Sequence, residues 1–260
     1  MTENKYSKIL VLGAGPVVIG SSSEYDYSAV SVCRALKEEG ISVVSVNSNP
    51  DTIMTDKNVA DTVYIEPLNG ETVKKIIEKE IPDAIIGTTG GEAGLEICLE
   101  LLQNGYLDEH GTKLLGIKPE TIKAIRNEQA LRDTLENVGE PYVSAKVLPT
   151  DAECVTFAGE IGFPVLISPA FTPDFSEPIR CENANDILSG FGSCAERSLV
   201  NEVYVRKCVD DYKEVEFVAM RDSFGNCISV SSTENIDSVG IHSGDSIVVI
   251  PCLLYTSDAA

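Results

Sequence analysis

The chain has 260 residues, 43% of them hydrophobic and 23% charged, which is ordinary for a soluble globular protein with room for two compact domains. Its 41 acidic residues outnumber the 20 basic ones and give a net charge of −21, which disfavours DNA and RNA as partners. No apolar run approaches the roughly 20 residues of a membrane span, and the start lacks a signal-peptide core, so we expect a cytoplasmic protein without a membrane partner.

The first half of the chain alternates apolar runs with helical patterns. Four short apolar runs are typical of buried parallel strands, at residues 8–15, 41–50, 83–91 and 113–117. Helical spacing of apolar residues is found between them, at residues 28–40, 71–80 and 92–105. Strands and helices that alternate with short connections predict an α/β fold, with a parallel sheet and helices on both of its faces.

The second half is expected to combine helices with antiparallel strands. The helices are predicted over residues 121–139 and 151–161, and the strands over 142–148, 163–168, 203–209, 214–222 and 226–233. The last two strands are joined by a short turn that contains glycine, as in a hairpin, and a further strand is expected in SIVVIP. We therefore expect an α/β domain over residues 1–122 and an α+β domain over residues 123–251.

The last nine residues, CLLYTSDAA (252–260), show no pattern of a strand or helix. The same string results when a common sequencing adaptor is translated in one reading frame. We therefore expect a non-native tail from adaptor read-through and a natural protein that continues beyond Pro251. The alternative is a genuine short tail, and sequencing of the source locus distinguishes the two.

The glycines of GAGPVVIG raise the question of a dinucleotide site. Gly13 and Gly15 allow a tight turn and a close approach to a phosphate. Gly20 comes two positions later than the G-x-G-x-x-G fingerprint requires, and Asn47 and Asn49 stand where an acid for ribose is expected. The residues leave two alternatives, a nucleotide-binding loop or a tight strand-to-helix turn, and the missing acid argues against an NAD(P)-dependent oxidoreductase.

Two further stretches carry polar side chains that suit a binding site. In GIHSGDS, His242 can donate to an anion, and Asp245 can orient it or reach a cation. In YKEVEFVAM, Glu214 and Glu216 share one face of a strand, where two carboxylates can hold hydroxyls or a metal. A solvated loop and a solvent-facing edge strand are the alternatives. The eight cysteines form no C-x-x-C pair, so the sequence predicts reduced thiols and no zinc site.

Several long stretches together resemble the large chain of carbamoyl-phosphate synthase. The opening LVLGAGPVVIGSSSEYDYSAVSVCRALKEEG and the following VNSNPDTIMTDKNVADTVYIEP look like the start of that family. The later SSTENIDSVGIHSGDSIVVIP is similar to its amino-terminal, bicarbonate-activating half rather than to its second half. Because the resemblance runs in register over about residues 7–251, the chain is identified as a member of this ATP-grasp family.

The resemblance implies a fold and a reaction. The fold is a parallel α/β pre-ATP-grasp domain, here residues 1–122, followed by a partial α+β ATP-grasp domain, residues 123–251. The reaction is that of an ATP-dependent ligase that uses Mg²⁺: ATP phosphorylates bicarbonate, ammonia from a glutamine amidotransferase small chain gives carbamate, and a second ATP yields carbamoyl phosphate for arginine and pyrimidine synthesis. The resemblance also implies that Gly13 to Gly20 are structural and do not hold the nucleotide.

Some ATP-binding positions of the family are matched in this sequence. By resemblance, an apolar contact on the adenine side falls on Val209, and the acid that holds ribose falls on Glu214. Main-chain and histidine contacts fall on Gly240, Ile241 and His242. These five residues are the candidate ATP-binding set.

Other positions depart from the family. Glu128 stands where the family has an arginine in the helix after the domain boundary, and Ser168 stands where it has an arginine before the phosphate loop. Lys207 stands where the family has an acid near the adenine. The glycine-rich phosphate loop is replaced by PDFSEP, which includes Asp174 and Phe175. Because a hydrogen bond to a charged group contributes roughly 1.5–3 kcal/mol, the loss of two arginines would cost about 3–6 kcal/mol of nucleotide binding.

The family's metal ligands lie beyond the end of this chain, so the resemblance implies that no Mg²⁺-binding pair is present here. Phosphoryl transfer depends on that metal for positioning and charge neutralisation. We therefore expect the chain by itself to be inactive in carboxyphosphate formation. The alternative is a pseudoenzyme or scaffold that binds a glutaminase subunit or another synthase chain.

Overall fold

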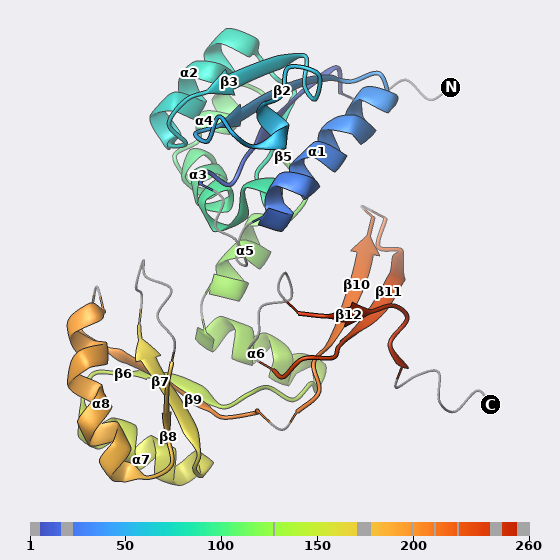
Figure 1. The fold of residues 1–260 in the computed structure, drawn as a ribbon. Helices are drawn as coiled ribbons and strands as arrows, with labels where there is room; N and C mark the ends of the chain where they lie inside the picture. The colour runs from blue at the N-terminus through green and yellow to red at the C-terminus, as the bar shows by residue number, and fades with distance from the viewer. Residues whose placement is uncertain are drawn as a thin grey trace. The chain divides into compact units, whose positions relative to one another are not determined.

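The computed structural model describes most of the chain, which divides into two compact units with sheets of their own (Figure 1). Met1–Ile125 forms most of the first unit, and Arg126–Gly240 forms most of the second. The described residues are 6–16, 23–126, 128–170, 178–198, 200–210, 212–222, 224–239 and 246–253. No helix within these ranges has the length and apolar character needed to cross a membrane.

A five-stranded parallel sheet lies at the centre of the first unit, with the strand order β3-β2-β1-β4-β5. Its strands are β1 (Lys8–Leu12), β2 (Ser42–Asn47), β3 (Thr62–Ile65), β4 (Ala84–Ile86) and β5 (Lys113–Leu115). The inner strands β1, β2 and β4 are almost fully buried, as apolar strands that are covered on both faces must be. The predicted α/β fold with a parallel sheet is confirmed.

Helices cover both faces of this sheet, and the side chains of β1 alternate between two cores. Ile9 and Val11 pack in one cluster with side chains of α1 (Ser23–Glu38). Leu10 and Leu12 pack in another cluster with side chains of α2 (Gly70–Glu80) and α3 (Gly91–Gln103). Full burial of each such side chain stabilises the fold by about 1.5–3 kcal/mol. Shorter elements are η1 (Ile53–Thr55), η2 (Thr88–Gly90) and α4 (Tyr106–Glu109).

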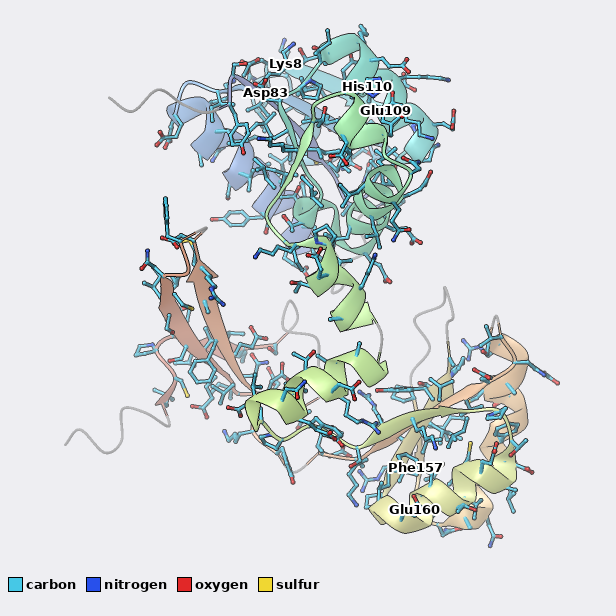
Figure 2. The ribbon with its side chains drawn as sticks, turned by 180° about the vertical axis from the view of Figure 1, so that it is seen from behind. Lys8, Asp83, Glu109, His110, Phe157 and Glu160 are labelled. Atoms are coloured by element: carbon cyan, nitrogen blue, oxygen red, sulfur yellow. The ribbon has the colours of Figure 1, made fainter. Side chains whose placement is uncertain are left out.

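The Asp83 carboxylate joins the beginning of β1 to the segment just before β4, and Figure 2 shows Lys8 and Asp83 side by side. Its Oδ2 atom accepts hydrogen bonds from the Ser7 hydroxyl at 2.7 Å, the Ser7 N–H at 2.7 Å and the Lys8 N–H at 3.0 Å. These bonds, with that of the Ser7 hydroxyl as the largest cause, hold the pKa of Asp83 below its usual range. The ionised carboxylate therefore stabilises the pairing of β1 with β4.

The second unit contains a four-stranded antiparallel sheet with the order β6-β9-β7-β8. Its strands are β6 (Ala145–Leu148), β7 (Val165–Pro169), β8 (Ile179–Cys181) and β9 (Val203–Lys207). The helices of this unit are α6 (Glu128–Val138), α7 (Asp151–Ile161) and α8 (Ala184–Arg197). Before them, α5 (Pro119–Arg126) lies at the end of the first unit.

The two faces of this sheet differ. Buried side chains such as Val165 and Val205 point toward α7 and α8 and form the core of this part of the unit. Because side chains alternate along a strand, their neighbours point to the other side, which we name the open face. The half-buried side chains of the open face on β7 and β9 are those of Leu166, Ser168, Tyr204 and Arg206.

A smaller antiparallel sheet contains β10 (Val215–Arg221), β11 (Cys227–Asn235) and β12 (Val248–Val249), in that order. The predicted hairpin is present as β10 and β11, with an irregular register between Val218 and Ala219. Exposed apolar side chains lie along both hairpin strands, at Phe217, Val218, Met220, Ile228 and Val230.

Four elements were not indicated by the apolar pattern of the sequence: β3, α4, β8 and α8. The strands β3 and β8 have four and three residues, too few for a clear alternation. The helix α8 contains Gly190 and Gly192, which lower helix propensity. In addition, α1 begins at Ser23, five residues before the predicted start. The segment 254–260 lies outside the described residues, so its interpretation as a non-native tail stays a prediction.

Candidate functional site

The turn after β1 is packed with the protein's own side chains. A Cβ atom at Gly13 would lie 2.6 Å from both Asn47 Cγ and Met54 Sδ. Gly15 has a φ of +79°, which favours glycine. Asn47 and Met54 are both buried, so the position where a phosphate would approach Gly13 is filled. Of the two alternatives for this motif, these contacts support the tight turn; Gly20 lies outside the described residues.

Asn47 holds this turn at the carboxyl end of β2. Its Oδ1 atom accepts a hydrogen bond from the Gly15 N–H at 2.9 Å, and its Nδ2 donates to Thr52 Oγ1 at 3.1 Å. The side chain is 1% exposed. An asparagine in this position therefore links the turn to the segment before η1 and presents no carboxylate to a ribose.

Val209 and Glu214 lie in the connector between β9 and β10. Val209 lines a cavity of about 300 Å³, together with Pro141, Tyr142, Val143, Ser144, Lys207 and Tyr212. Glu214 follows two residues after Tyr212, and its backbone carbonyl accepts a hydrogen bond from the Asn235 N–H at 3.1 Å. The neighbouring Lys213 pairs through Nζ with the buried Glu234 carboxylate at 3.0 Å. The backbone on both sides of Glu214 is thus tied to β11.

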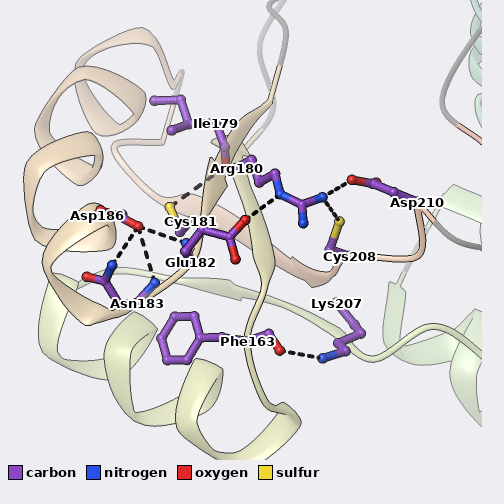
Figure 3. Close-up of polar contacts among 10 residues, drawn as sticks. All are labelled: Phe163, Ile179, Arg180, Cys181, Glu182, Asn183, Asp186, Lys207, Cys208 and Asp210. Carbon is purple, nitrogen blue, oxygen red and sulfur yellow. Dashed lines mark hydrogen bonds and ion pairs between the residues drawn. The ribbon is translucent and has the colours of Figure 1, made fainter.

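Lys207 has a structural contact in this protein. Its Nζ atom donates hydrogen bonds to Gly162 O at 2.9 Å and to Phe163 O at 3.2 Å, the second of which is drawn in Figure 3. These carbonyls directly follow the end of α7, where the helix dipole favours a cation. The ammonium is therefore held at the end of α7.

Arg180 joins β8 to the connector that carries Val209 (Figure 3). Its Nε donates to Glu182 Oε1 at 2.8 Å, and its Nη1 contacts the Asp210 carboxylate and, at 3.2 Å, Cys208 Sγ. Burial raises the pKa of the Cys208 thiol. The guanidinium charge is thus paired with two carboxylates. Sequence reasoning missed this group, because only the fold brings Arg180 to a connector about 30 residues away.

The remaining candidate positions are not brought together within the described residues. Ser168 lies on the open face of β7, opposite Tyr204 of β9, and Glu128 is the first residue of α6. The residues Asp174, Phe175, Gly240, Ile241, His242 and Asp245 lie outside the described residues. No group of three or more His, Cys, Asp or Glu side chains that could hold a metal ion occurs in the part of the chain that the structure describes.

Two protein-family models match the chain in tandem. The carbamoyl phosphate synthase preATP-grasp domain matches residues 5–124, and the carbamoyl-phosphate synthase L chain, ATP binding domain, matches residues 127–259. The chain belongs to the carbamoyl-phosphate synthase large-chain family. The resemblance seen in the sequence is confirmed, and the family is one of ATP-dependent ligases.

Curated relatives show the same similarity at the level of sequence. The chain is 48% identical over 248 residues to the carbamoyl phosphate synthase large chain of Agathobacter rectalis. The matched region covers 95% of this chain and 23% of that protein. It is 45% identical over 244 residues to that of Clostridium perfringens strain SM101, with 94% and 23% covered. The chain thus spans about a quarter of the length of the relatives that it matches.

Solved structures with a similar fold include biotin carboxylases. One of them is the biotin carboxylase domain of 2-oxoglutarate carboxylase from Hydrogenobacter thermophilus, in complex with MgADP, ADP and bicarbonate. It is 21% identical to this chain with a TM-score of 0.68, and the match covers 88% of this chain and 50% of that chain. The β,γ-ATP complex of biotin carboxylase from Campylobacter jejuni is 20% identical, also with a TM-score of 0.68, and 88% and 51% are covered. At this level of identity the comparison establishes the fold.

Proposed function

We propose that this chain is the part of a carbamoyl phosphate synthase large chain that binds ATP for the activation of bicarbonate. The observation that carries the proposal is the tandem match of both domain models to the two units of the fold. In this role ATP transfers its γ-phosphoryl group to a bicarbonate oxygen, which leaves ADP and carboxyphosphate. A glutamine amidotransferase small chain would supply the ammonia that attacks the carboxyphosphate, and the reaction would take place in the cytoplasm.

The side chains around the connector suit the base and ribose of a nucleotide. Val209, Val143 and the rings of Tyr142 and Tyr212 give an apolar and aromatic lining, which matches the face of a purine. The volume of about 300 Å³ lies at the lower end of the range for ligand pockets. Glu214, nearby on the connector, is the acid assigned to the ribose hydroxyls. These residues therefore fit a nucleoside.

The described residues fit Mg²⁺ less well, because they contain no cluster of metal-ligating side chains. If Mg²⁺ accompanies the nucleotide, it would neutralise phosphate charge and position the reacting groups. Within the described chain the work of the protein is to bind and orient the nucleoside through the connector.

Titration of the chain with MgATP in a calorimeter tests the proposal. We expect a dissociation constant in the micromolar range, and we expect Glu214→Gln to weaken binding about tenfold, because a hydrogen bond to a charged group is lost. Glu160→Gln is the matched control, because Glu160 is an exposed acid on α7 and its loss of charge should leave binding unchanged. An unchanged affinity in Glu214→Gln would contradict the assignment of the ribose contact.

A scaffold without nucleotide binding is the second candidate function. It is favoured by Glu128 and Ser168, where the family resemblance places arginines. In this case no heat of binding would be seen at millimolar MgATP, and the chain would instead bind a purified glutaminase small chain in the same calorimeter. For either candidate we expect no bicarbonate-dependent ATP hydrolysis above background from this chain by itself.

A further inference from the structure

The open face of the four-stranded sheet carries two arginines that lie close to the positions where the family resemblance places arginines. Arg206 of β9 is opposite Leu166 of β7, and Ser168 is two residues further along β7 on the same face. Arg132 follows position 128 of α6 by four residues, which is about one helical turn. A positive charge is therefore present one helical turn after position 128. A second one lies on the neighbouring strand, diagonally across from position 168.

Arg132 reaches the sheet beside Arg206. One of its guanidinium nitrogens, Nη2, donates to the backbone carbonyl of Ala145 on β6, and Ala145 pairs directly with Arg206. Its guanidinium carbon lies 5.0 Å from the centre of the Tyr142 ring, in a cation–π contact. Arg132 of α6 is thus tied to the residue of β6 that pairs with Arg206 of β9.

Among the described residues neither arginine has a carboxylate partner. Within the described ranges no Asp or Glu lies within ion-pair distance of Arg132 or Arg206, although the chain has 41 acids and 20 bases. The Nε–H of Arg132 is buried and has no hydrogen-bond partner among the described residues. Arg180, on the other side of Leu166, differs because Glu182 and Asp210 already neutralise it. Buried donors and half-buried charges of this kind are normally satisfied, so an anion is the missing partner.

A second cavity, which Arg132 lines and Arg206 does not, adjoins the proposed nucleoside site. It has a volume of about 250 Å³ and is lined by Leu131, Arg132, Leu135, Tyr142, Val143 and Tyr204. Tyr142 and Val143 also line the cavity next to Val209, so the two cavities adjoin along this segment. A ligand with an apolar base in one cavity could place an anionic group in the other.

We propose that Arg132 and Arg206 bind the phosphate groups of the nucleotide and replace the arginines expected at positions 128 and 168. The proposal rests on the proposed function, because it assigns the phosphate end of the same nucleotide. Guanidinium groups suit this role, since their planar donors match phosphate oxygens and are always charged.

The test is a calorimetric series of adenosine, AMP, ADP and ATP against wild type, Arg206→Met and Arg132→Met. In wild type the affinity should rise with the number of phosphates. Each variant should weaken ATP binding about tenfold or more and leave adenosine binding within about twofold. Lys146→Met is the matched control, because this exposed lysine lies next to Ala145 on β6 and alternates to the opposite face.

The outcomes separate the two proposals. If wild type binds neither adenosine nor ATP, the proposed function fails. If wild type binds ATP and both arginine variants bind it as Lys146→Met does, the proposed function stands and the arginine assignment is refuted. Should Arg132→Met fail to fold, Arg206→Met decides alone, because the Arg206 side chain makes no hydrogen bond or ion pair to the described residues. Increased salt should weaken ATP binding more steeply in wild type than in Arg206→Met.

Discussion

Replacement of Gly13 by alanine tests whether the glycine turn after β1 is structural. The added Cβ would lie 2.6 Å from Asn47 Cγ and 2.6 Å from Met54 Sδ, whereas ordinary contacts of this kind begin near 3.4 Å. Neither neighbour has room to move, because Met54 is fully buried and Asn47 is 1% exposed. Steric relief therefore requires that Asn47 give up its hydrogen bonds to Gly15 and Thr52.

The expected cost is the sum of these effects. Overpacking of a core by one methyl group costs about 1–3 kcal/mol, and each of the two lost hydrogen bonds costs about 0.5–1.5 kcal/mol. We therefore expect Gly13→Ala to lower the free energy of unfolding of the first unit by about 2–6 kcal/mol. Urea unfolding followed by far-UV circular dichroism measures this, with the transition of the first unit fitted separately from that of the second.

Gly159→Ala is the matched control for this experiment. Gly159 lies inside α7, and a Cβ atom built on it meets no atom within 4 Å. Both substitutions change the unfolded chain in the same way, so their difference reports the packing around Gly13. We expect Gly159→Ala to raise stability by about 0.5–1 kcal/mol, since alanine favours a helix over glycine. A Gly13→Ala variant that is as stable as wild type would refute the packing argument and reopen the nucleotide interpretation of this turn.

Three further predictions follow from individual contacts. Asp83→Asn should lower the free energy of unfolding by about 1 kcal/mol at neutral pH, because the amide accepts the Ser7 bonds more weakly than the carboxylate. Because folding lowers the pKa of Asp83, this difference should be complete above about pH 4 and vanish at lower pH, as acid unfolding curves would show. Lys207→Met should lower the free energy of unfolding, measured by urea denaturation, by about 1 kcal/mol, because two carbonyls after α7 lose their donor. Lys146→Met, at a nearby exposed lysine, should leave it unchanged. Cys227 should react first with a thiol reagent, because its side chain is exposed, whereas Cys98 is buried and burial raises its pKa to about 12. Equal labelling rates for all eight thiols would contradict this difference in burial.

The parallel sheet could be predicted from the sequence because its inner strands are mainly apolar and because glycine directly follows β1 and β4. The antiparallel half was harder. In α8, Gly190 hides the helical pattern, and the helix packs tightly there, since a Cβ atom at this position would lie 3.0 Å from Ile167 Cδ1. The start of α8 does have a signal in the sequence, because Asn183 and Asp186 form a capping box.

The candidate site shows a sharper limit of sequence reasoning. Val209 could be named only through the family resemblance, because nothing in its local pattern distinguishes it from an ordinary connector. The local pattern did single out Glu214 as one of two carboxylates, but only the resemblance assigned it to ribose. The contacts of Lys207 with the end of α7 and of Arg132 with Ala145 depend on which strands pair, and β6 pairs with β9 across about 60 residues. Such long-range pairing leaves no local trace in the sequence, so these roles become visible only in the fold.

The exposed hairpin strand β10 bears on the colloidal behaviour of the protein. Among the described residues β10 pairs with a strand on one side only, and Phe217, Val218 and Met220 on it are exposed. An exposed apolar strand is a template for association between copies, and like charge on the molecules opposes their encounter. With a calculated isoelectric point near 4.4, that repulsion is strong at neutral pH and disappears in mild acid. Light scattering should therefore rise reversibly as the pH approaches this value, before the core of either unit unfolds.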